Sequence, residues 1–375
     1  MYNERKYIVV IGTKSYFDNY VRQKLNSDYD NIDTLSDVVI TYTKKINTGK
    51  KEFERSSILI VRNDDYHSIA ETAHNRLGSL IEDITTNDAN IFIHNPTMDL
   101  DRYLKNLEEQ DKIQIEREYQ EYTMQCTPQE FFVKMKNISS NIIGQVDAVR
   151  SISKSLWYLT QINRKKPFVV MLYGNSGIGK TEMIREIAKE FFDSKFLEKH
   201  LSMFKNNVNS EYLFGNQPNR TNIGFDLLQR ESNLLFLDEF DKLADYFYSI
   251  FYTLFDNIKF NDSTYEVDIS GLLIFLTSNY ASEDEIMKHL GKPIYYRIDK
   301  FIHFKDFSPD TIYEITMFEI KKYVAESNSN LNETILYHDV CKKILSKGEN
   351  ARTIKNKVLW SVEDTFFKEV ENSST

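Results

Sequence analysis

The sequence predicts an α/β protein with a parallel-sheet core, a C-terminal helical lid and a small N-terminal α/β domain. From residue 142 onward, candidate strands alternate with helices, which is the order that builds a parallel sheet. One of these strands, Phe168–Tyr173, is wholly apolar and runs into a glycine-rich loop and an amphipathic helix. After Ser308-Pro309 the pattern turns helical, over residues 311–326, 337–345 and 353–370.

Composition restricts the classes of protein that the chain can belong to. Its 375 residues correspond to two or three domains at roughly 150 residues each. The 47 basic and 56 acidic residues leave a net charge of −9, which makes nucleic acid an unlikely partner. Cys126 and Cys341 are too few for a disulfide scaffold or a structural zinc site. The apolar runs are too short for a signal peptide or a membrane span, so we expect a soluble, cytoplasmic protein.

The first 112 residues are expected to form an α/β domain. The β-branched and apolar runs predict strands at residues 7–11, 37–43, 57–61 and 90–94. Helical spacing predicts helices at residues 15–25, 67–84, 99–109 and 113–124, and Thr127-Pro128 is typical of a helix start. We therefore expect an N-terminal domain (1–112), a helical linker (113–139), a large subdomain (140–307) and a helical lid (308–375).

Polar residues in this N-terminal part allow two interpretations. Asp64, Asp65 and His67 follow the strand at 57–61, where they would either line a ligand cleft at the strand tip or simply pack. The spacing of His67, His74 and His94 is not that of a zinc site, so ordinary packing is the favoured interpretation.

The glycine-rich loop carries the most specific motif of the chain. GNSGIGKT, from Gly174 to Thr181, matches G-x-x-x-x-G-K-[ST] in the required strand–loop–helix context. Such glycines let successive backbone N–H groups curl around an anion, and the helix N-terminus adds positive potential. Lys180 is then placed to reach the β- and γ-phosphates of a nucleotide, and Thr181 to offer its hydroxyl to Mg²⁺.

Two further strands end in polar residues that suit phosphoryl transfer. The apolar run 234–237 is followed by Asp238 and Glu239, about 57 residues after the loop. At the carboxyl edge of a parallel sheet, Asp238 would hold Mg²⁺ and Glu239 would act as general base toward water. The run 272–276 is followed by Thr277, Ser278 and Asn279, and we expect the Asn279 amide to orient that water rather than merely to cap a turn.

Taken together, these motifs resemble the AAA+ superfamily, and within it the Clp-type ATPases and their relatives the torsins. The resemblance covers about residues 140–370 and implies a P-loop AAA+ core with a helical lid, using ATP and Mg²⁺. Since AAA+ proteins usually hold a partner-binding domain at the position of residues 1–112, the resemblance also implies that role for the N-terminal α/β domain. NIIGQ at 141–145 resembles the adenine-covering segment, which assigns Ile142 and Ile143 to nucleotide binding. The resemblance assigns the phosphate loop to the same role, with these residues: Gly174, Asn175, Ser176, Gly177, Ile178, Gly179, Lys180, Thr181 and Glu182.

The resemblance also implies two catalytic arginines and an oligomer. YYRIDKFIHF at 295–304 resembles the segment with the arginine finger, which falls on Arg297, and NARTIKN at 350–356 resembles the lid segment, which places a second arginine at Arg352. Arg352 would act on its own subunit's nucleotide and Arg297 on the neighbour's, which implies a homo-oligomer, usually a hexameric ring.

The segment corresponding to the family's polypeptide-gripping loop departs from the pattern. LFGNQPNRTNIGF at 213–225 looks shorter than the family's loop, and its tip near Asn219 to Asn222 has no aromatic residue. Phe214 and Phe225 flank the tip, and core packing is the favoured interpretation of both. IGF at 223–225 lies away from the place of a peptidase-docking loop, so we do not expect peptidase docking.

Two functions remain open on the sequence alone. The first is an ATP-hydrolysing, ring-forming Clp-type chaperone that remodels a protein partner. The second is a nucleotide-dependent switch or assembly scaffold that acts on one dedicated partner without threading polypeptide, which the missing aromatic favours. A DNA-acting AAA+ ATPase is disfavoured by the Clp-type motifs and the acidic charge.

Overall fold

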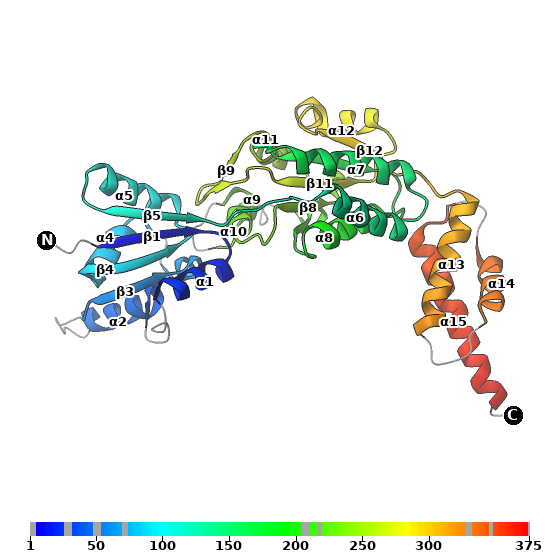
Figure 1. Cartoon of the computed structure of the whole chain (residues 1–375), viewed down its shortest axis with the longest axis horizontal. Helices are drawn as coiled ribbons and strands as arrows, with labels where there is room; N and C mark the ends of the chain where they lie inside the picture. The colour runs from blue at the N-terminus through cyan, green and yellow to red at the C-terminus, as the bar shows by residue number, and fades with distance from the viewer. Residues whose placement is uncertain are drawn as a thin grey trace.

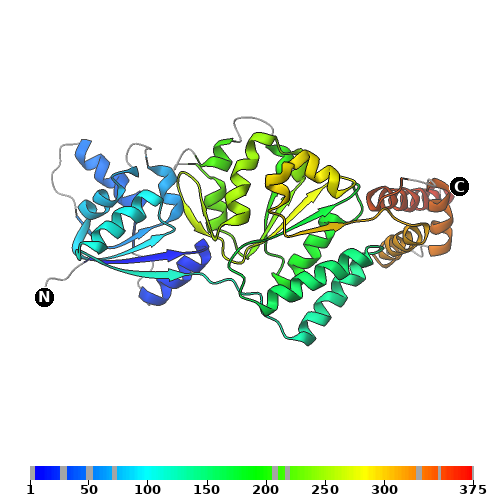
Figure 2. The same cartoon turned by 90° about the horizontal axis from the view of Figure 1, so that it is seen from above.

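The computed structural model describes residues 5–25, 32–47, 54–69, 74–204, 210–215, 220–326, 332–344 and 348–373. Three bodies follow one another along the molecule: an N-terminal α/β unit, a central α/β unit and a C-terminal helical unit (Figure 1). The N-terminal and C-terminal units lie at opposite ends of the central unit in both views (Figures 1 and 2). In the described part of the chain, none of the helices combines the length and the apolar character needed to cross a bilayer.

The central unit is built on a five-stranded parallel sheet in the order β12-β6-β11-β8-β7. The strands are β6 (Phe168–Tyr173), β7 (Leu197–His200), β8 (Leu234–Asp238), β11 (Leu273–Ser278) and β12 (Lys300–His303). Both faces are covered, because alternate residues of β6 enter two different apolar clusters. Strands buried on both faces read as continuous apolar runs, and this explains why β6, β8 and β11 could be found from the sequence.

Helices pack on each face of this sheet. One face is covered by α6 (Pro128–Asn141), α7 (Val146–Gln161) and α8 (Lys180–Phe191). The other is covered by α10 (Ile223–Leu228), α11 (Tyr248–Asp256) and α12 (Glu283–Tyr295). The remaining elements are short: η3 (Leu201–Met203), α9 (Ser210–Phe214), η5 (Phe240–Lys242), η6 (Asp245–Phe247), and the antiparallel hairpin of β9 (Lys259–Asn261) and β10 (Glu266–Asp268).

The N-terminal unit is a second parallel sheet, in the order β2-β3-β4-β1-β5. Its strands are β1 (Lys6–Ile11), β2 (Asp33–Thr34), β3 (Ser56–Val61), β4 (Thr85–His94) and β5 (Gln114–Tyr119). Its helices are α1 (Lys14–Leu25), α2 (Leu35–Asn47), η2 (Asn63–Ser68), α4 (Leu77–Ile84) and α5 (Met98–Glu109). The sheet has an apolar cluster on each face, which is the α/β architecture expected for this part of the chain.

Three expected elements of this unit are wrong or shifted. Residues 37–43 form part of α2 and not a strand, because Leu35 and Val38 are buried one helical turn apart and this outweighs the β-branched composition. Residues 114–119 form β5 and not a helix: this charged strand pairs along β1 at the edge of the sheet, so the sheet continues beyond residue 112. Of the helix expected over 67–84, the described residues show α4 at its C-terminal end, whereas residues 67 and 68 belong to the 3-10 helix η2.

The C-terminal unit consists of three helices, as expected. They are α13 (Pro309–Glu326), α14 (Glu333–Lys343) and α15 (Ala351–Ser373). Their shared core is formed by Ile315, Ile320, Leu336, Val340, Ile354, Val358 and Val362. This core is separate from those of the central sheet, so the helical unit is attached to the central unit through the chain at 304–308 and a few contacts described below.

Candidate functional site

The loop from Gly174 to Gly179 joins the buried end of β6 to the first turn of α8. Gly174, Gly177 and Gly179 all have positive φ, at 132°, 76° and 100°. A Cβ at Gly174 would lie 2.3 Å from the carbonyl oxygen of Phe304, whereas a Cβ at Gly179 would meet no heavy atom within 4 Å. The loop is therefore packed against its own chain at Gly174 and open at Gly179, where backbone at a helix N-terminus is accessible to an anion.

Lys180 begins α8 and is 7 % exposed. Its Nζ donates to the carbonyl oxygens of Gly174 and Asn175, both at 2.6 Å, and to Oδ1 of Asn279 at 3.3 Å. Burial lowers the pKa of the ammonium to about 8, although the carboxylates of Asp241 and Asp238 act in the opposite direction. Within the described residues no carboxylate oxygen lies within 4.0 Å of Nζ. The charge is thus held by neutral groups, and an anion would stabilise it strongly.

At the end of β8, a hydroxyl group links the two acidic residues to β11. Thr277 Oγ1 donates to Oδ1 of Asp238 and accepts from the backbone N–H of Glu239 at 3.0 Å. The same N–H also reaches Asp238 Oδ1 at 3.1 Å. Glu239 has φ of +56°, an unusual conformation for a residue with a side chain, and its carboxylate makes no hydrogen bond within the described residues. The backbone at Glu239 is therefore held in a strained turn.

The second oxygen of Asp238 faces β7, a contact that the sequence did not reveal. His200 Nδ1 lies 3.3 Å from Oδ2 of Asp238, and Glu198, His200 and Asp238 could each offer one ligand atom within a 4.8 Å cluster. These residues meet because β7 is hydrogen-bonded to β8, which only the strand order shows. Since Mg²⁺ prefers oxygen ligands, His200 fits less well as a Mg²⁺ ligand than the oxygens of Asp238 and Thr181.

The remaining loop residues have separate surroundings. Ile178 is buried in the central core, and Asn175 Nδ2 donates to Asp306 Oδ1 at 2.7 Å. Thr181 is half-buried in the first turn of α8, whereas Ser176 and Glu182 are exposed. Thr181 directly follows Lys180, so both side chains come from the first turn of α8.

Residues 142–145 lie between the central unit and the helical unit. Ile142 packs in the central core, and Ile143 packs against the core of the helical unit. Gln145, which was part of the sequence motif but not among the expected site residues, donates from Nε2 to the carbonyl oxygens of Ile178 at 3.2 Å and Lys305 at 2.8 Å. This side chain therefore fixes the phosphate loop to the segment that leads into the helical unit.

Arg352 lies on the helical unit where it touches the phosphate loop. The N–H of Ala351 donates to the carbonyl oxygen of Gly177 at 2.9 Å, and a Cβ at Gly177 would lie 2.7 Å from Asn350 Cγ. Arg352 follows in the first turn of α15, is exposed, and makes no hydrogen bond or ion pair within the described part of the chain. A charged guanidinium thus lies within one helical turn of the contact with the loop.

Arg297 is not brought to this loop. It lies between α12 and β12, pairs with Asp256 at 2.5 Å, and is placed 4.8 Å from the centre of the Tyr252 ring. Asp256 also pairs with Lys166, which precedes β6, so Arg297 belongs to the amino edge of the sheet. The loop follows the carboxyl end of β6, so within one chain the two lie at opposite edges.

The two aromatic residues that flank the expected gripping loop are packed. Phe214 stacks on Phe247 with ring centres 6.3 Å apart. Phe225 lies 5.2 Å from the ring of His67 and 6.4 Å from that of Tyr265. The tip near Asn219 falls partly outside the described residues, which omit 216–219. Both flanking aromatics therefore have the packing role that the sequence favoured.

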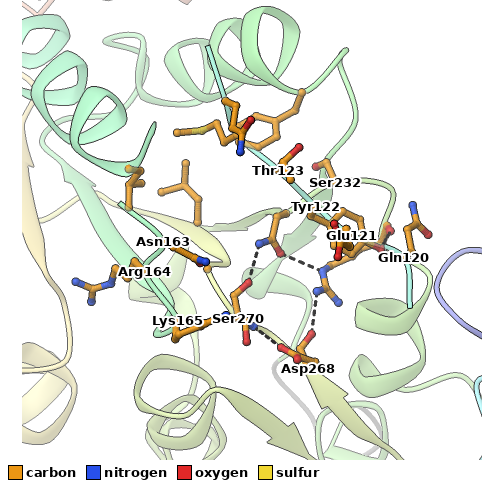
Figure 3. A pocket seen from close by; sticks show the side chains of 18 of the residues that line it. Gln120, Glu121, Tyr122, Thr123, Asn163, Arg164, Lys165, Ser232, Asp268 and Ser270 are labelled. Carbon is orange, nitrogen blue, oxygen red and sulfur yellow. Dashed lines mark hydrogen bonds between the residues drawn. The ribbon is translucent and has the colours of Figure 1, made fainter. Parts of the chain in front are cut away.

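A cavity of about 850 Å³ lies at the amino edge of the central sheet, and no residue of the phosphate loop lines it. Figure 3 shows side chains of its wall. Its wall includes Tyr122, Arg230, Asp268 and Ser270. Tyr122 donates to the carbonyl oxygen of Arg230 at 2.6 Å, and Arg230 donates to that of Asp268 at 2.8 Å. These wall groups are bonded to one another, and no expected site residue belongs to the cavity.

Comparison with known proteins identifies the central unit. Residues 170–306 match the family model "ATPase family associated with various cellular activities (AAA)". The chain is 25 % identical over 277 residues to the chaperone protein ClpB of Prochlorococcus marinus, covering 64 % of this chain and 32 % of that protein. It is 28 % identical over 172 residues to the human mitochondrial disaggregase, covering 41 % of this chain and 23 % of that protein. The chain thus spans about a quarter to a third of these relatives.

A solved structure shares the fold. "Closed State CryoEM Reconstruction of Hsp104:ATPyS and FITC casein" aligns with a TM-score of 0.58 at 12 % identity, over 99 % of this chain and 89 % of that one. At this identity the likeness concerns the fold alone. The strand order β12-β6-β11-β8-β7, with the phosphate loop after β6 and a helical lid after β12, is the P-loop α/β architecture expected from the sequence.

Proposed function

Because the chain carries an AAA ATPase domain of the Clp type, we propose that it is an ATP-hydrolysing, ring-forming protein that remodels a protein partner. The observation that carries the proposal is the meeting of three strand ends at one edge of the central sheet. Lys180, Asp238 with Glu239, and Asn279 follow β6, β8 and β11, and Lys180 bonds directly to Asn279. The likeness to chaperones and a disaggregase supports a protein as the partner.

In this proposal the phosphate loop binds the nucleotide. The open backbone at Gly179 and the ammonium of Lys180 suit the β- and γ-phosphates, since both offer positive charge and Lys180 Nζ hydrogen-bonds to neutral oxygens of the loop. Ile142 and Ile143 would cover the base, and Arg352 would approach the phosphates from the lid. The contact between Ala351 and Gly177 supports this last role, because it holds the start of α15 against the loop.

Mg²⁺ fits the oxygen donors of Thr181 and Asp238. When bound, it would neutralise charge on the phosphates and draw electron density from them. The Asp238 carboxylate is oriented by the Thr277 hydroxyl and the Glu239 N–H. Glu239, whose carboxylate accepts no hydrogen bond from the described residues, would take the proton of the attacking water, and Asn279 would orient that water.

Arg297 is proposed to serve the nucleotide of the neighbouring subunit. Its distance from the loop of its own chain, at the other edge of the sheet, supports a role in trans. A test uses two variants that are each expected to be inactive, Arg297→Ala and Lys180→Ala. Mixing them restores ATP turnover if an intact site accepts an arginine from a neighbour. Turnover that stays at the level of the separate variants would contradict the trans arrangement, and with it the ring.

A dedicated switch or assembly scaffold is the second candidate, and one observation favours it. Phe214 and Phe225 are both packed, and the sequence has no aromatic residue between them with which to grip polypeptide. The two functions differ in what a Glu239→Gln variant, which should bind ATP without turnover, retains from the native host. Many unrelated proteins retained with ATP would indicate a general unfoldase, whereas one stoichiometric partner would indicate the dedicated function.

The proposed location is the cytoplasm. Cys126 and Cys341 are both free thiols, which suits a reducing compartment.

A further inference from the structure

The carboxyl edge of the N-terminal sheet is covered by the hairpin β9–β10 of the central unit. Tyr265 Oη donates to Asn63 Oδ1 at 3.0 Å, and the N–H of Met98 donates to the carbonyl oxygen of Thr264 at 2.8 Å. Tyr265 is 1 % exposed and Asn63 is fully buried. In open parallel sheets this edge is where ligands bind. Here a turn of the same chain occupies it, and the two units lie against each other on this side (Figures 1 and 2).

Hydrogen bonds between polar groups cross this interface, beside the rings of Tyr265 and Phe225. The apolar clusters of the two units are distinct, and Ile11 is a half-buried residue that packs against both. The buried Nδ2 of Asn63 has no hydrogen-bond partner among the residues that the structure describes. Interfaces between units of one chain resemble transient protein–protein interfaces, so relative motion of the two units is the default expectation.

The same hairpin turn holds α10, the helix that precedes β8. Asp262 Oδ1 accepts from the N–H groups of Thr264 and Tyr265 at 2.7 and 2.8 Å, and its Oδ2 accepts from the N–H of Gly224 at 3.2 Å. A Cβ at Gly224 would lie 2.3 Å from that Oδ2, so glycine is required for the approach. One carboxylate therefore connects the docked turn to the first turn of α10.

The far end of α10 touches the N-terminal unit directly. The backbone N–H of Lys14 donates to Gln229 Oε1 at 2.9 Å, immediately after the last residue of α10. The ring of Phe225, within α10, lies against His67 of the N-terminal unit. Both ends of this short helix are thus fixed by the docked arrangement, through Asp262 at one end and Gln229 at the other.

We propose that this interface is a separable dock through which the N-terminal unit controls the position of α10. When docked, the N-terminal unit holds the Asp262 turn and α10 in place. A protein partner that takes the carboxyl edge of the N-terminal sheet displaces the hairpin and frees α10. To replace the hairpin, the partner must offer a hydroxyl group to Asn63 Oδ1 and a carbonyl oxygen to the N–H of Met98.

The test measures amide hydrogen exchange over residues 222–228 in the full-length chain without nucleotide, so it does not depend on ATP hydrolysis. Tyr265→Phe removes only the hydroxyl group that reaches Asn63. The loss of one such hydrogen bond is expected to open the dock about fivefold more often, and exchange over 222–228 to rise by about the same factor. Met98→Pro removes the other donor at the first position of α5, where proline is tolerated, and the same rise is expected.

Tyr20→Phe is the matched control. The Tyr20 hydroxyl donates to Glu116 at 2.6 Å on an exposed part of the N-terminal unit, away from the hairpin. This variant should leave exchange over 222–228 unchanged, and all three variants should leave the exchange of α15 unchanged. The proposal is contradicted if amide exchange over residues 222–228 stays at the wild-type rate in both Tyr265→Phe and Met98→Pro. The proposal is also contradicted if Tyr20→Phe accelerates exchange over residues 222–228 as much as the two interface variants do.

Discussion

The ammonium of Lys180 makes nucleotide affinity depend on pH in a defined direction. Burial lowers its pKa to about 8 in the free protein. A bound phosphate favours the charged form, so the pKa rises on binding and affinity is highest where the lysine is already protonated. Below pH 8 the affinity should be flat. Above pH 8 each pH unit should weaken binding about tenfold, or about 1.4 kcal/mol, until the pKa of the bound form is reached.

Isothermal titration calorimetry with ATP between pH 7 and pH 9.5 measures this dependence. The dissociation constant should be about tenfold larger at pH 9 than at pH 7, and binding at pH 9 should take up a proton. Lys180→Arg is the control, because its guanidinium stays charged throughout; it should bind more weakly at every pH, but with a flat profile. A flat wild-type profile would show that nucleotide affinity does not depend on the protonation of Lys180, and an equal loss of affinity at high pH in the arginine variant would show the same.

Three further predictions follow from individual contacts. Thr277→Val removes the hydroxyl group that joins the ends of β8 and β11. The rate of ATP turnover should fall about tenfold or more. The affinity for ATP, measured by equilibrium titration, should stay within about twofold of the wild-type value. Gly144→Ala places a Cβ 2.2 Å from Thr311 Cγ2 at a φ of +78°, and should lower the free energy of urea unfolding by about 2 kcal/mol; adding Thr311→Ala should recover about half of this. Glu349→Ala leaves the largely buried ammonium of Lys357 without its carboxylate partner. The free energy of unfolding of the helical lid, measured by thermal unfolding, should therefore fall by about 3 kcal/mol. An unchanged free energy of unfolding would mean that the ion pair is solvated.

The sequence predicted the phosphate loop and its neighbours well because each motif is contiguous and sits on a strand with a strong apolar signal. β6, β8 and β11 are buried on both faces, so their runs are unmistakable and the polar residues at their ends follow directly. The contact of His200 with Asp238 gave no such signal. It depends on β7 lying beside β8, and a four-residue strand at the edge carries no strong pattern.

The N-terminal unit was harder to predict for a physical reason. In α2 the spacing of Leu35 and Val38 competed with β-branched composition, and burial of one helical face prevailed. In β5 the charges of Gln114–Tyr119 suggested a solvated helix, yet an edge strand exposes one face and tolerates the same charges. The dock joins Asn63 to Tyr265, about 200 residues apart, and no local pattern reports such a contact.

In the proposed function, Lys180 and Glu239 belong to one site that hydrolyses ATP. The most direct test is steady-state ATP turnover together with ATP binding for the wild-type chain, Lys180→Ala and Glu239→Gln, each at a concentration that supports assembly. We expect turnover by the wild type, loss of binding and turnover in Lys180→Ala, and binding without turnover in Glu239→Gln. Turnover by either variant at the wild-type rate would contradict a shared ATP-hydrolysing site.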